Sequence, residues 1–248
     1  MPNIAWGITG ASDKLKATFD EMEKVAAMDD VRITTFITQA GVEILKHASL
    51  IKRLAAISDG SPYREIVTPK SHGAANWLGA RFFAREYETM LVAPCTSNTL
   101  CKFRAGIADT PVTNAAAWAT KAGLSVFILQ THMTIGQIEH PLVVRVDPTL
   151  CKRCDDCPPS RSCRYGAISR KQGFPFINFL KCVACGDCVS PCPYRAVRQA
   201  ERFKLNRRMV DQQAAEAIAQ IKGMVILTET RQIETTLKRY AARLPENL

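Results

Sequence analysis

Eight of the ten cysteines fall in one short segment, where they form two runs of nearly the same spacing. The runs are Cys151, Cys154, Cys157 and Cys163, then Cys182, Cys185, Cys188 and Cys192. A Cys-x-x-Cys-x-x-Cys run on a tight loop can direct three thiolates at one iron–sulfur cube, and the fourth ligand must come from elsewhere. Zinc sites use pairs of cysteine pairs, and disulfides would require an exported chain, so these alternatives are weaker. The spacing therefore predicts [4Fe–4S] clusters and the transfer of single electrons.

The repeat extends beyond the cysteines, and residues 145–204 resemble bacterial two-cluster ferredoxins. Cys-Arg-Tyr-Gly-Ala-Ile at 163–168 answers Cys-Pro-Tyr-Arg-Ala-Val at 192–197. In those ferredoxins the fourth cysteine of each run binds the other cluster. The resemblance therefore implies two ligand sets, namely Cys151, Cys154, Cys157 with Cys192, and Cys182, Cys185, Cys188 with Cys163. The first copy departs from the pattern, because five residues rather than three separate Cys157 from Cys163, and because Arg164 replaces the usual proline.

The chain is long enough for one large and one small domain, and its charge is basic. It has 248 residues and a formal charge of +10, which two oxidised clusters would lower by roughly four units. Lys and Arg are scattered without an aromatic-interleaved stripe, which disfavours nucleic acid as a partner. No apolar run reaches the ~20 residues that cross a membrane, and the beginning lacks a signal-peptide pattern. We therefore expect a cytoplasmic protein with no membrane contact.

Outside the cysteine segment, apolar strands alternate with helical patterns. We expect strands at residues 4–9, 31–38, 66–67, 89–93 and 125–129. We expect helices from residue 13, at 41–56, 76–86 and 98–105, and after the cysteines a helix at 209–222, a strand at 223–227 and a helix at 232–243. This alternation predicts an α/β, doubly wound parallel sheet of the Rossmann or flavodoxin type. An α+β ferredoxin-like domain, 145–204, is then inserted into a domain made of 1–144 and 205–248.

Two turns at the ends of predicted strands could hold a ligand. Gly10-Ala11-Ser12 follows the first strand, and the helix start after it offers free N–H groups to a phosphate. The alternative is a plain turn in which Ser12 caps the helix. Pro94-Cys95-Thr96-Ser97-Asn98-Thr99 follows the fourth strand, where such sheets bind ligands. This polar turn could also be a helix cap.

These turns, together with Gly106-Ile107-Ala108-Asp109, resemble the homo-oligomeric flavoproteins, which include flavin-containing cysteine decarboxylases and flavin prenyltransferases. The resemblance covers about 1–140 and 206–248 and implies bound FMN. Gly10, Ala11 and Ser12 would hold its phosphate, and Thr96 to Thr99 would line the ring and ribitol. The whole set of implied cofactor-binding residues is Gly10, Ala11, Ser12, Thr38, Thr96, Ser97, Asn98, Thr99, Asp109 and Thr131.

Departures from the decarboxylases disfavour decarboxylation. Their essential His has no counterpart, because Gly79, Ala80 and Arg81 occupy that register and His72 lies farther upstream. Their substrate clamp is replaced by the sequence Gln-Thr-His-Met at 130–133. No proton donor stands out, and His132 and Asp109 are candidates only. We interpret Cys95 and Cys101 as small buried hydrophobes.

The combination of this flavoprotein with a ferredoxin insert is similar to the dihydromethanopterin reductases (acceptor) and to related archaeal iron–sulfur flavoproteins. The resemblance implies an oxidoreductase that passes electrons from a one-electron donor, such as a flavodoxin- or ferredoxin-type carrier, through two clusters to FMN and then to a pterin. The pterin would be dihydromethanopterin, reduced to tetrahydromethanopterin for one-carbon metabolism. The alternatives are an electron-transfer flavoprotein that serves another protein, a flavin prenyltransferase-like enzyme, and a redox sensor.

The family also implies a homo-oligomer built on trimers, with the flavin where subunits meet. Residues 112–122 are small and apolar, and could pack subunits closely or form an internal helix. The insert leaves the sheet after residue 129 and rejoins it before residue 209. Two such tethers restrain a domain better than one linker does. We therefore expect a cluster within electron-tunnelling reach of a flavin.

Overall fold

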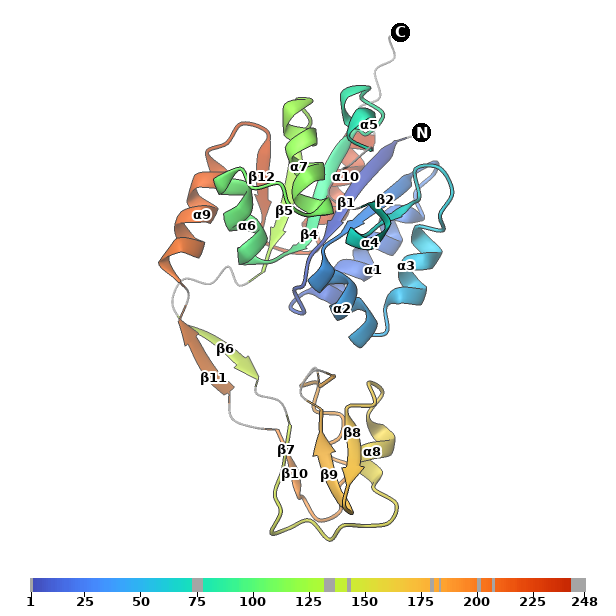
Figure 1. Cartoon of the computed structure of the whole chain (residues 1–248), viewed down its shortest axis with the longest axis vertical. Coiled ribbons are helices and arrows are strands. Elements are labelled where there is room, and N and C mark those ends of the chain that lie inside the picture. The colour runs from blue at the N-terminus through green and yellow to red at the C-terminus, as the bar shows by residue number, and fades with distance from the viewer. Residues whose placement is uncertain are drawn as a thin grey trace. The chain divides into compact units, whose positions relative to one another are not determined.

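The computed structural model describes residues 2–72, 78–131, 137–141, 144–178, 181–182, 184–199, 202–206 and 208–241 (Figure 1). The chain divides into two compact units. The first unit comprises Met1–Lys46, Leu50–Ile135 and Arg208–Leu248, and the second is mainly Gly136–Arg207. The second unit is thus an insertion between two parts of the first. His132 lies outside the described residues, as does the side chain of His72.

The first unit is built on a six-stranded sheet with the order β12-β5-β4-β1-β2-β3, and every neighbouring pair is parallel. The strands are β1 (Asn3–Ile8), β2 (Arg32–Ile37), β3 (Ile66–Val67), β4 (Thr89–Cys95), β5 (Val126–Gln130) and β12 (Met224–Leu227). The chain winds outward from β1 in one direction to β3 and then in the other direction from β4 to β12. The sheet is therefore doubly wound, as the sequence predicts. The point at which the strand order reverses direction lies between β1 and β4.

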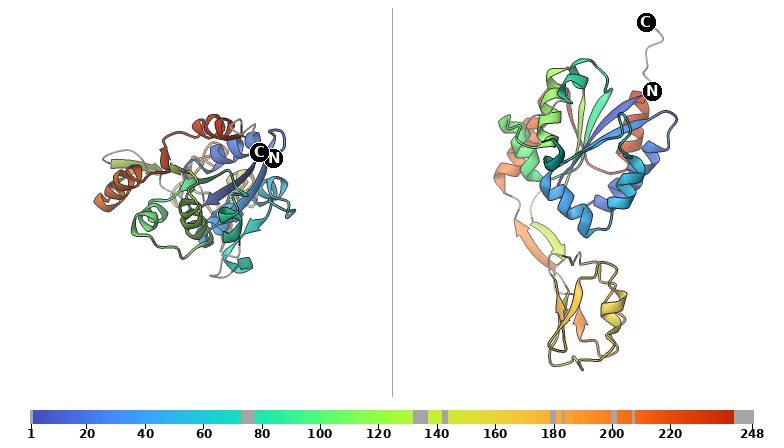
Figure 2. Two further views of the ribbon diagram at one scale, coloured as in Figure 1. Left: turned by 90° about the horizontal axis from the view of Figure 1, so that it is seen from above. Right: turned by 45° about the vertical axis from the view of Figure 1, so that its right-hand side comes forward.

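Helices cover both faces of this sheet (Figure 2). They are α1 (Leu15–Ala26), α2 (Gln39–His47), α3 (Ile51–Ile57), α4 (Pro69–His72), α5 (Gly79–Phe83), α6 (Ser97–Ala105), α7 (Pro111–Lys121), α9 (Met209–Ala219) and α10 (Gln232–Ala241). Side chains alternate along β5 accordingly. Ile128 joins a core cluster with Val112 of α7 and Ala214 of α9. Phe127 points the other way, and its ring centroid lies 5.2 Å from that of Tyr240 on α10.

Several element boundaries differ from the prediction. Helix α1 begins at Leu15 rather than at residue 13, because Lys14 adopts a left-handed φ of 60°, so Ser12 does not cap the helix. The helix expected at 41–56 is two helices, α2 and α3, separated around Ser49, which has a φ of 57°. Strand β4 continues through Pro94 to Cys95.

The small-residue stretch at 112–122 forms most of α7. Its Val112, Ala115 and Ala116 are buried in the core of the same chain. The internal-helix alternative therefore describes this face of α7, which is not open for contact between subunits.

The second unit contains three antiparallel strand pairs among its described residues. They are β6 (Gln137–Pro141) with β11 (Arg202–Asn206), β7 (Arg145–Val146) with β10 (Val197–Arg198), and β8 (Ile168–Lys171) with β9 (Phe174–Ile177). A short helix, α8 (Pro158–Ser162), occupies the five residues between Cys157 and Cys163, so the longer spacing of the first run is one helical turn. The architecture is an α/β doubly wound parallel sheet with an inserted α+β unit. Among the described residues, no helix is long and apolar enough to span a membrane.

Candidate functional site

The loops that follow β1 and β4 meet at the switch point of the sheet. The buried hydroxyl of Thr9 donates a hydrogen bond to the carbonyl oxygen of Pro94 at 2.8 Å and accepts one from the backbone N–H of Thr96 at 2.9 Å. Thr131, just after β5, donates both its backbone N–H and its hydroxyl to the carbonyl oxygen of Cys95, at 3.0 and 3.1 Å. Hydrogen bonds from the side chains of Thr9 and Thr131 therefore join the carboxyl ends of β1, β4 and β5, and they fix the geometry of this edge.

Two helices begin at the same edge, and threonines cap both. The hydroxyl of Thr38, after β2, accepts a hydrogen bond from the backbone N–H of Gly41 at 3.0 Å. The hydroxyl of Thr96, after β4, accepts one from the backbone N–H of Thr99. The hydroxyls of Thr38 and Thr96 therefore act as helix caps in this chain. The positive ends of α2 and α6 still point at the edge, where they favour an anionic or polar ligand.

The turn after β1 presents backbone donors. Within the described part of the chain, the backbone N–H groups of Gly10, Ala11 and Ser12 donate no hydrogen bond. Successive free N–H groups before a helix form an anion-binding concavity. Gly10 is required here for packing, because a Cβ at this position would lie 2.5 Å from the Cβ of Ala40 on α2. Ala11 is buried and the side chain of Ser12 is exposed.

Gln130, the last residue of β5, carries a buried amide without a partner. Its side chain is 0% exposed, and neither its Oε1 nor its Nε2 has a hydrogen-bond partner among the described residues. It pairs in register with Cys95 of β4, so it belongs to the same edge as Thr131. An unpaired buried amide costs stability and calls for a ligand or another explanation. From the sequence, Gln130 was noted only as a departure from the decarboxylases, although a polar residue at the end of an apolar strand indicates a ligand site.

The remaining predicted residues are less tied to this edge. Ser97 is half-buried and Asn98 is exposed, and no hydrogen bond to either side chain is present among the described residues. Asp109 is exposed in the loop before α7, where its carboxylate lies 2.6 Å from the Nζ of Lys102. That hydrogen bond lowers the pKa of Asp109 and holds it as a carboxylate, which does not suit a proton donor. Burial raises the pKa of the Cys95 thiol and makes it unreactive.

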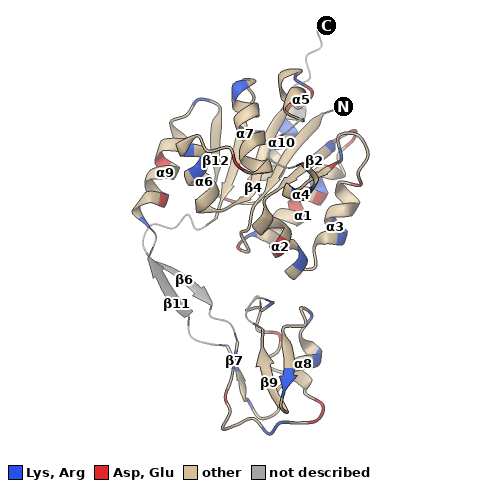
Figure 3. Ribbon diagram, viewed as in Figure 1, with Lys and Arg blue, Asp and Glu red and all other residues tan. Residues whose placement is uncertain are grey.

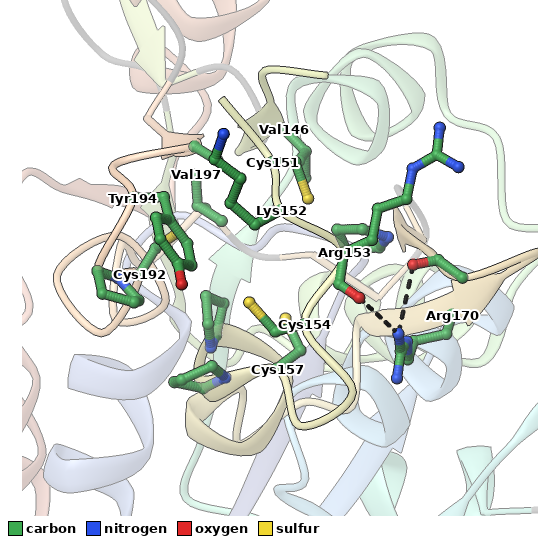
Figure 4. Close-up of a pocket in the computed structure, with 16 residues that line it drawn as sticks. Val146, Cys151, Lys152, Arg153, Cys154, Cys157, Arg170, Cys192, Tyr194 and Val197 are labelled. Carbon is green, nitrogen blue, oxygen red and sulfur yellow. Dashed lines mark hydrogen bonds between the residues drawn. The ribbon is translucent and has the colours of Figure 1, made fainter. Parts of the chain in front are cut away.

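In the second unit, the cysteines surround two pockets. The first cysteine pocket is lined by Cys151, Cys154, Cys157 and Cys192 (Figure 4). The second cysteine pocket is lined by Cys163, Cys182, Cys185 and Cys188. Each pocket takes three cysteines from one run and one from the other. No group of three Cys, His, Asp or Glu side chains within the described ranges is placed to hold a single metal ion. Four thiolates around a pocket suit a [4Fe–4S] cube, in which each iron takes one cysteine.

The second pocket is the more apolar of the two. Val144, Ile168 and Ile177 line it, and Cys188 belongs to the same small core. Burial raises the pKa of Cys188 to about 11, so this thiol needs bound iron to become a thiolate at neutral pH. The backbone N–H of Ala167 donates to the Sγ of Cys163 at 3.3 Å. Hydrogen bonds to the cluster sulfurs are one of the features that set a cluster's reduction potential.

Comparison with known proteins identifies both units. The model of the family described as Flavoprotein matches residues 1–145. The chain belongs to the flavoprotein family. A model described as 4Fe-4S binding domain matches residues 175–198, which include the second cysteine run of this flavoprotein.

Two relatives match nearly the whole flavoprotein. The chain is 33% identical to the dihydromethanopterin reductase (acceptor) of Methanosarcina mazei, over 90% of this chain and 94% of the relative. It is 30% identical to the protein of that name from Methanocaldococcus jannaschii, over 93% of each chain. Among solved structures, Burkholderia xenovorans DmrB in complex with FMN, described as a cubic protein cage for redox transfer, matches with a TM-score of 0.56. The two chains are 15% identical, and the match covers 98% of this chain and 97% of DmrB, which shows the shared fold.

The edge fits a bound flavin nucleotide on the chain's own features. The free N–H groups of residues 10–12 can hold a phosphate, and the buried amide of Gln130 can hydrogen-bond a polar ring edge. A flavin supplies the ability to take up electrons singly and release them in pairs.

Proposed function

We propose that this flavoprotein is a dihydropterin reductase that takes electrons from a one-electron donor and uses FMN and two [4Fe–4S] clusters, with dihydromethanopterin as its substrate. Support comes from the two relatives named dihydromethanopterin reductase (acceptor), which match over at least nine-tenths of the chain. In the structure, the main support is that one chain contains both a polar edge of the sheet and two pockets that are each lined by four cysteines. The domain boundaries 1–144, 145–204 and 205–248 are part of this proposal.

The chain's residues would divide the work as follows. Gly10, Ala11 and Ser12 would hold the FMN phosphate by their backbone N–H groups. Thr9 and Thr131 would keep the strand ends at fixed spacing. The proposed polar contacts to the rest of FMN are Thr38, Thr96, Ser97, Asn98, Thr99, Asp109, Thr131 and Gln130. The proposed cluster ligands are Cys151, Cys154, Cys157 and Cys192 for one cube, and Cys163, Cys182, Cys185 and Cys188 for the other.

We further propose a homo-oligomer built on trimers and a cytoplasmic location. DmrB is described as a cubic cage, and a cube has three-fold axes at its corners. Phe83 is 53% exposed and packs edge-on against Trp118 at 4.9 Å, which offers an apolar surface for a neighbouring subunit. Thiolate-held clusters suit a reducing compartment. A monomer in light scattering at micromolar concentration would contradict the oligomer.

Anaerobic turnover tests the proposed function. The holoprotein, reduced methyl viologen as donor and either dihydromethanopterin, dihydrofolate or no pterin would be mixed, and the oxidation of the viologen would be followed with the formation of tetrahydropterin. We expect oxidation that depends on the dihydropterin and is fastest with dihydromethanopterin. Viologen oxidation at the same rate without any pterin would contradict the reductase.

A further inference from the structure

The second unit is basic even when its clusters are counted. Residues 145–199 contain ten Lys or Arg and four Asp or Glu, an excess of six positive charges. Two oxidised cubes with their thiolates contribute about −4. The loaded unit therefore keeps a positive surface, and the described Lys and Arg of this unit are drawn in Figure 3.

The positive charge is distributed unequally between the two cysteine pockets. Lys152, Arg153 and Arg170 line the first cysteine pocket. Apart from its cysteines, the described lining of the second cysteine pocket consists of apolar side chains and Tyr165, and contains no Lys or Arg. The two pockets have the same number of cysteines, so they differ in the cations of the first and in the apolar lining of the second.

The cations at the first pocket are also not neutralised by ion pairs within the described residues. Three other basic side chains of this unit are neutralised in the ion pairs Arg161–Asp156, Arg164–Asp187 and Arg198–Asp147. Within the described residues, Lys152, Arg153 and Arg170 form no ion pair. The nearest acid in sequence, Asp155, also forms no ion pair among the described residues, so the side chains beside this pocket carry a charge of about +2. This charge offsets the charge of about −2 on an oxidised cube in this pocket, whereas no described lining cation offsets the cube of the second pocket.

One cation of this surface, Arg170, is held in place by the main chain. The guanidinium of Arg170 donates to the carbonyl oxygens of Arg153 and Gly173 at 3.2 and 3.4 Å (Figure 4). The guanidinium of Arg153 lies 6.0 Å from the ring centroid of Phe174. Tyr194, which also lines the pocket, is 44% exposed. The pocket wall thus presents an anchored Arg170 and an exposed Tyr194, and Arg and Tyr are residue types that are enriched at protein interfaces.

We propose that the surface formed by Lys152, Arg153, Arg170 and Tyr194 is the docking site for an acidic one-electron carrier protein, and that the first cysteine pocket is where its electron enters. This inference rests on the proposed function, which supplies the cluster. One electron leaves the reduced carrier, which is oxidised by one electron, and the cluster at this pocket is reduced by one electron. A negatively charged carrier is attracted by the cations and is brought within reach of the acceptor.

Two substitutions of the same kind test the docking surface in the full-length holoprotein. Lys152→Glu reverses a charge at the first pocket, next to Cys151. Lys181→Glu reverses a charge that is also exposed and also forms no ion pair within the described residues, and it lies next to Cys182, which belongs to the second pocket. The donor is a fully reduced acidic flavodoxin, and its one-electron oxidation is followed by stopped-flow absorbance at low ionic strength.

We expect Lys152→Glu to lower the second-order rate constant about tenfold, as two charge units about 6 Å from a carboxylate would do in water. Lys181→Glu should change it less than twofold. Raising the salt from about 0.05 to 0.5 M should slow the wild type and flatten the difference between the proteins. With reduced methyl viologen, a small cationic donor, neither variant should be slower than the wild type.

Equal slowing by the two variants, or no effect of Lys152→Glu, would overturn the docking site. So would slowing of Lys152→Glu with methyl viologen, because the change would then act on the cluster itself. Lys152-dependent binding of a short DNA duplex with no effect on the flavodoxin reaction would assign the surface to nucleic acid instead. Dihydropterin turnover with methyl viologen tests the proposed function separately, since that donor needs no docking surface.

Discussion

Replacing Thr9 by Val should loosen the strand edge that holds the proposed flavin site. The two side chains have nearly the same shape, so the substitution removes the hydroxyl and little else. Thr9 is 1% exposed, and its hydroxyl is the acceptor for the backbone N–H of Thr96 and a donor to Pro94. Pro94 keeps a bond from the backbone N–H of Thr9 at 3.3 Å, whereas the N–H of Thr96 loses its acceptor. An unsatisfied buried donor costs about 1–3 kcal/mol, so we expect the free energy of unfolding to fall by about 2 kcal/mol.

Thr18 provides a matched control in the same unit. It is 0% exposed, and its hydroxyl has no hydrogen-bond partner in the part of the chain that the structure describes. Thr18→Val removes a buried polar group that gains nothing from its position, and Val and Thr have similar helix propensities. We therefore expect this variant to match the wild type or to exceed it by about 1 kcal/mol.

The assay is urea unfolding of the flavin-free and cluster-free chain, followed by far-UV circular dichroism, together with a flavin titration of each folded variant. Thr9→Val should unfold at lower urea and bind FMN more weakly, and Thr18→Val should do neither. Equal losses of stability in the two variants would refute the assignment of the Thr9 hydroxyl as the link between β1 and β4.

Three further substitutions address the cofactor sites. Gln130→Leu loses no hydrogen bond of the chain itself, so the flavin-free protein should be at least as stable as the wild type in urea, while FMN affinity should fall about five- to tenfold, the value of one hydrogen bond; unchanged affinity would remove Gln130 from the site. Cys192→Ala should halve the iron content from about eight to about four per chain and abolish the electron paramagnetic resonance signal of the cluster held by Cys151, Cys154 and Cys157; loss of the other signal instead would contradict the exchange of fourth ligands. Ser12→Asp places a carboxylate beside the proposed phosphate site and should yield colourless protein, whereas Ser12→Ala should stay yellow; full flavin occupancy in both would disprove the phosphate assignment.

Much of the fold could be predicted from local patterns. Strands such as β1 and β5 are runs of apolar residues with polar turns at their ends, and their alternation with helices predicts a parallel sheet. The strand order could not be derived in this way, because pairing between β1 and β4 is decided by packing of residues that are about 85 apart in sequence. The predicted start of α1 was wrong because a single residue, Lys14, adopts a positive φ that the sequence pattern does not indicate.

The candidate site was predictable to a different degree in each unit. The spacing of the cysteines by itself predicts iron–sulfur ligands, so both runs could be identified from the sequence. The grouping of Cys192 with the first run came from the resemblance to ferredoxins. At the strand edge, sequence indicated which turns are polar but not which side chains are already satisfied. The hydroxyls of Thr38 and Thr96 accept hydrogen bonds from the backbone N–H groups at helix starts, whereas the side-chain amide of Gln130 has no hydrogen-bond partner among the described residues. That distinction depends on the folded geometry.

The central claim is that the clusters deliver electrons to the flavin within one assembly, and stopped-flow reduction of the flavin tests it most directly. The wild type would be compared with Cys154→Ala and Cys185→Ala, each of which removes one ligand from a different pocket, after confirming that FMN content and oligomeric state are unchanged. A low-potential one-electron donor should reduce the wild-type flavin quickly and the flavin of both variants far more slowly. Equal rates in all three proteins would show that electrons reach the flavin without the clusters and would contradict the account.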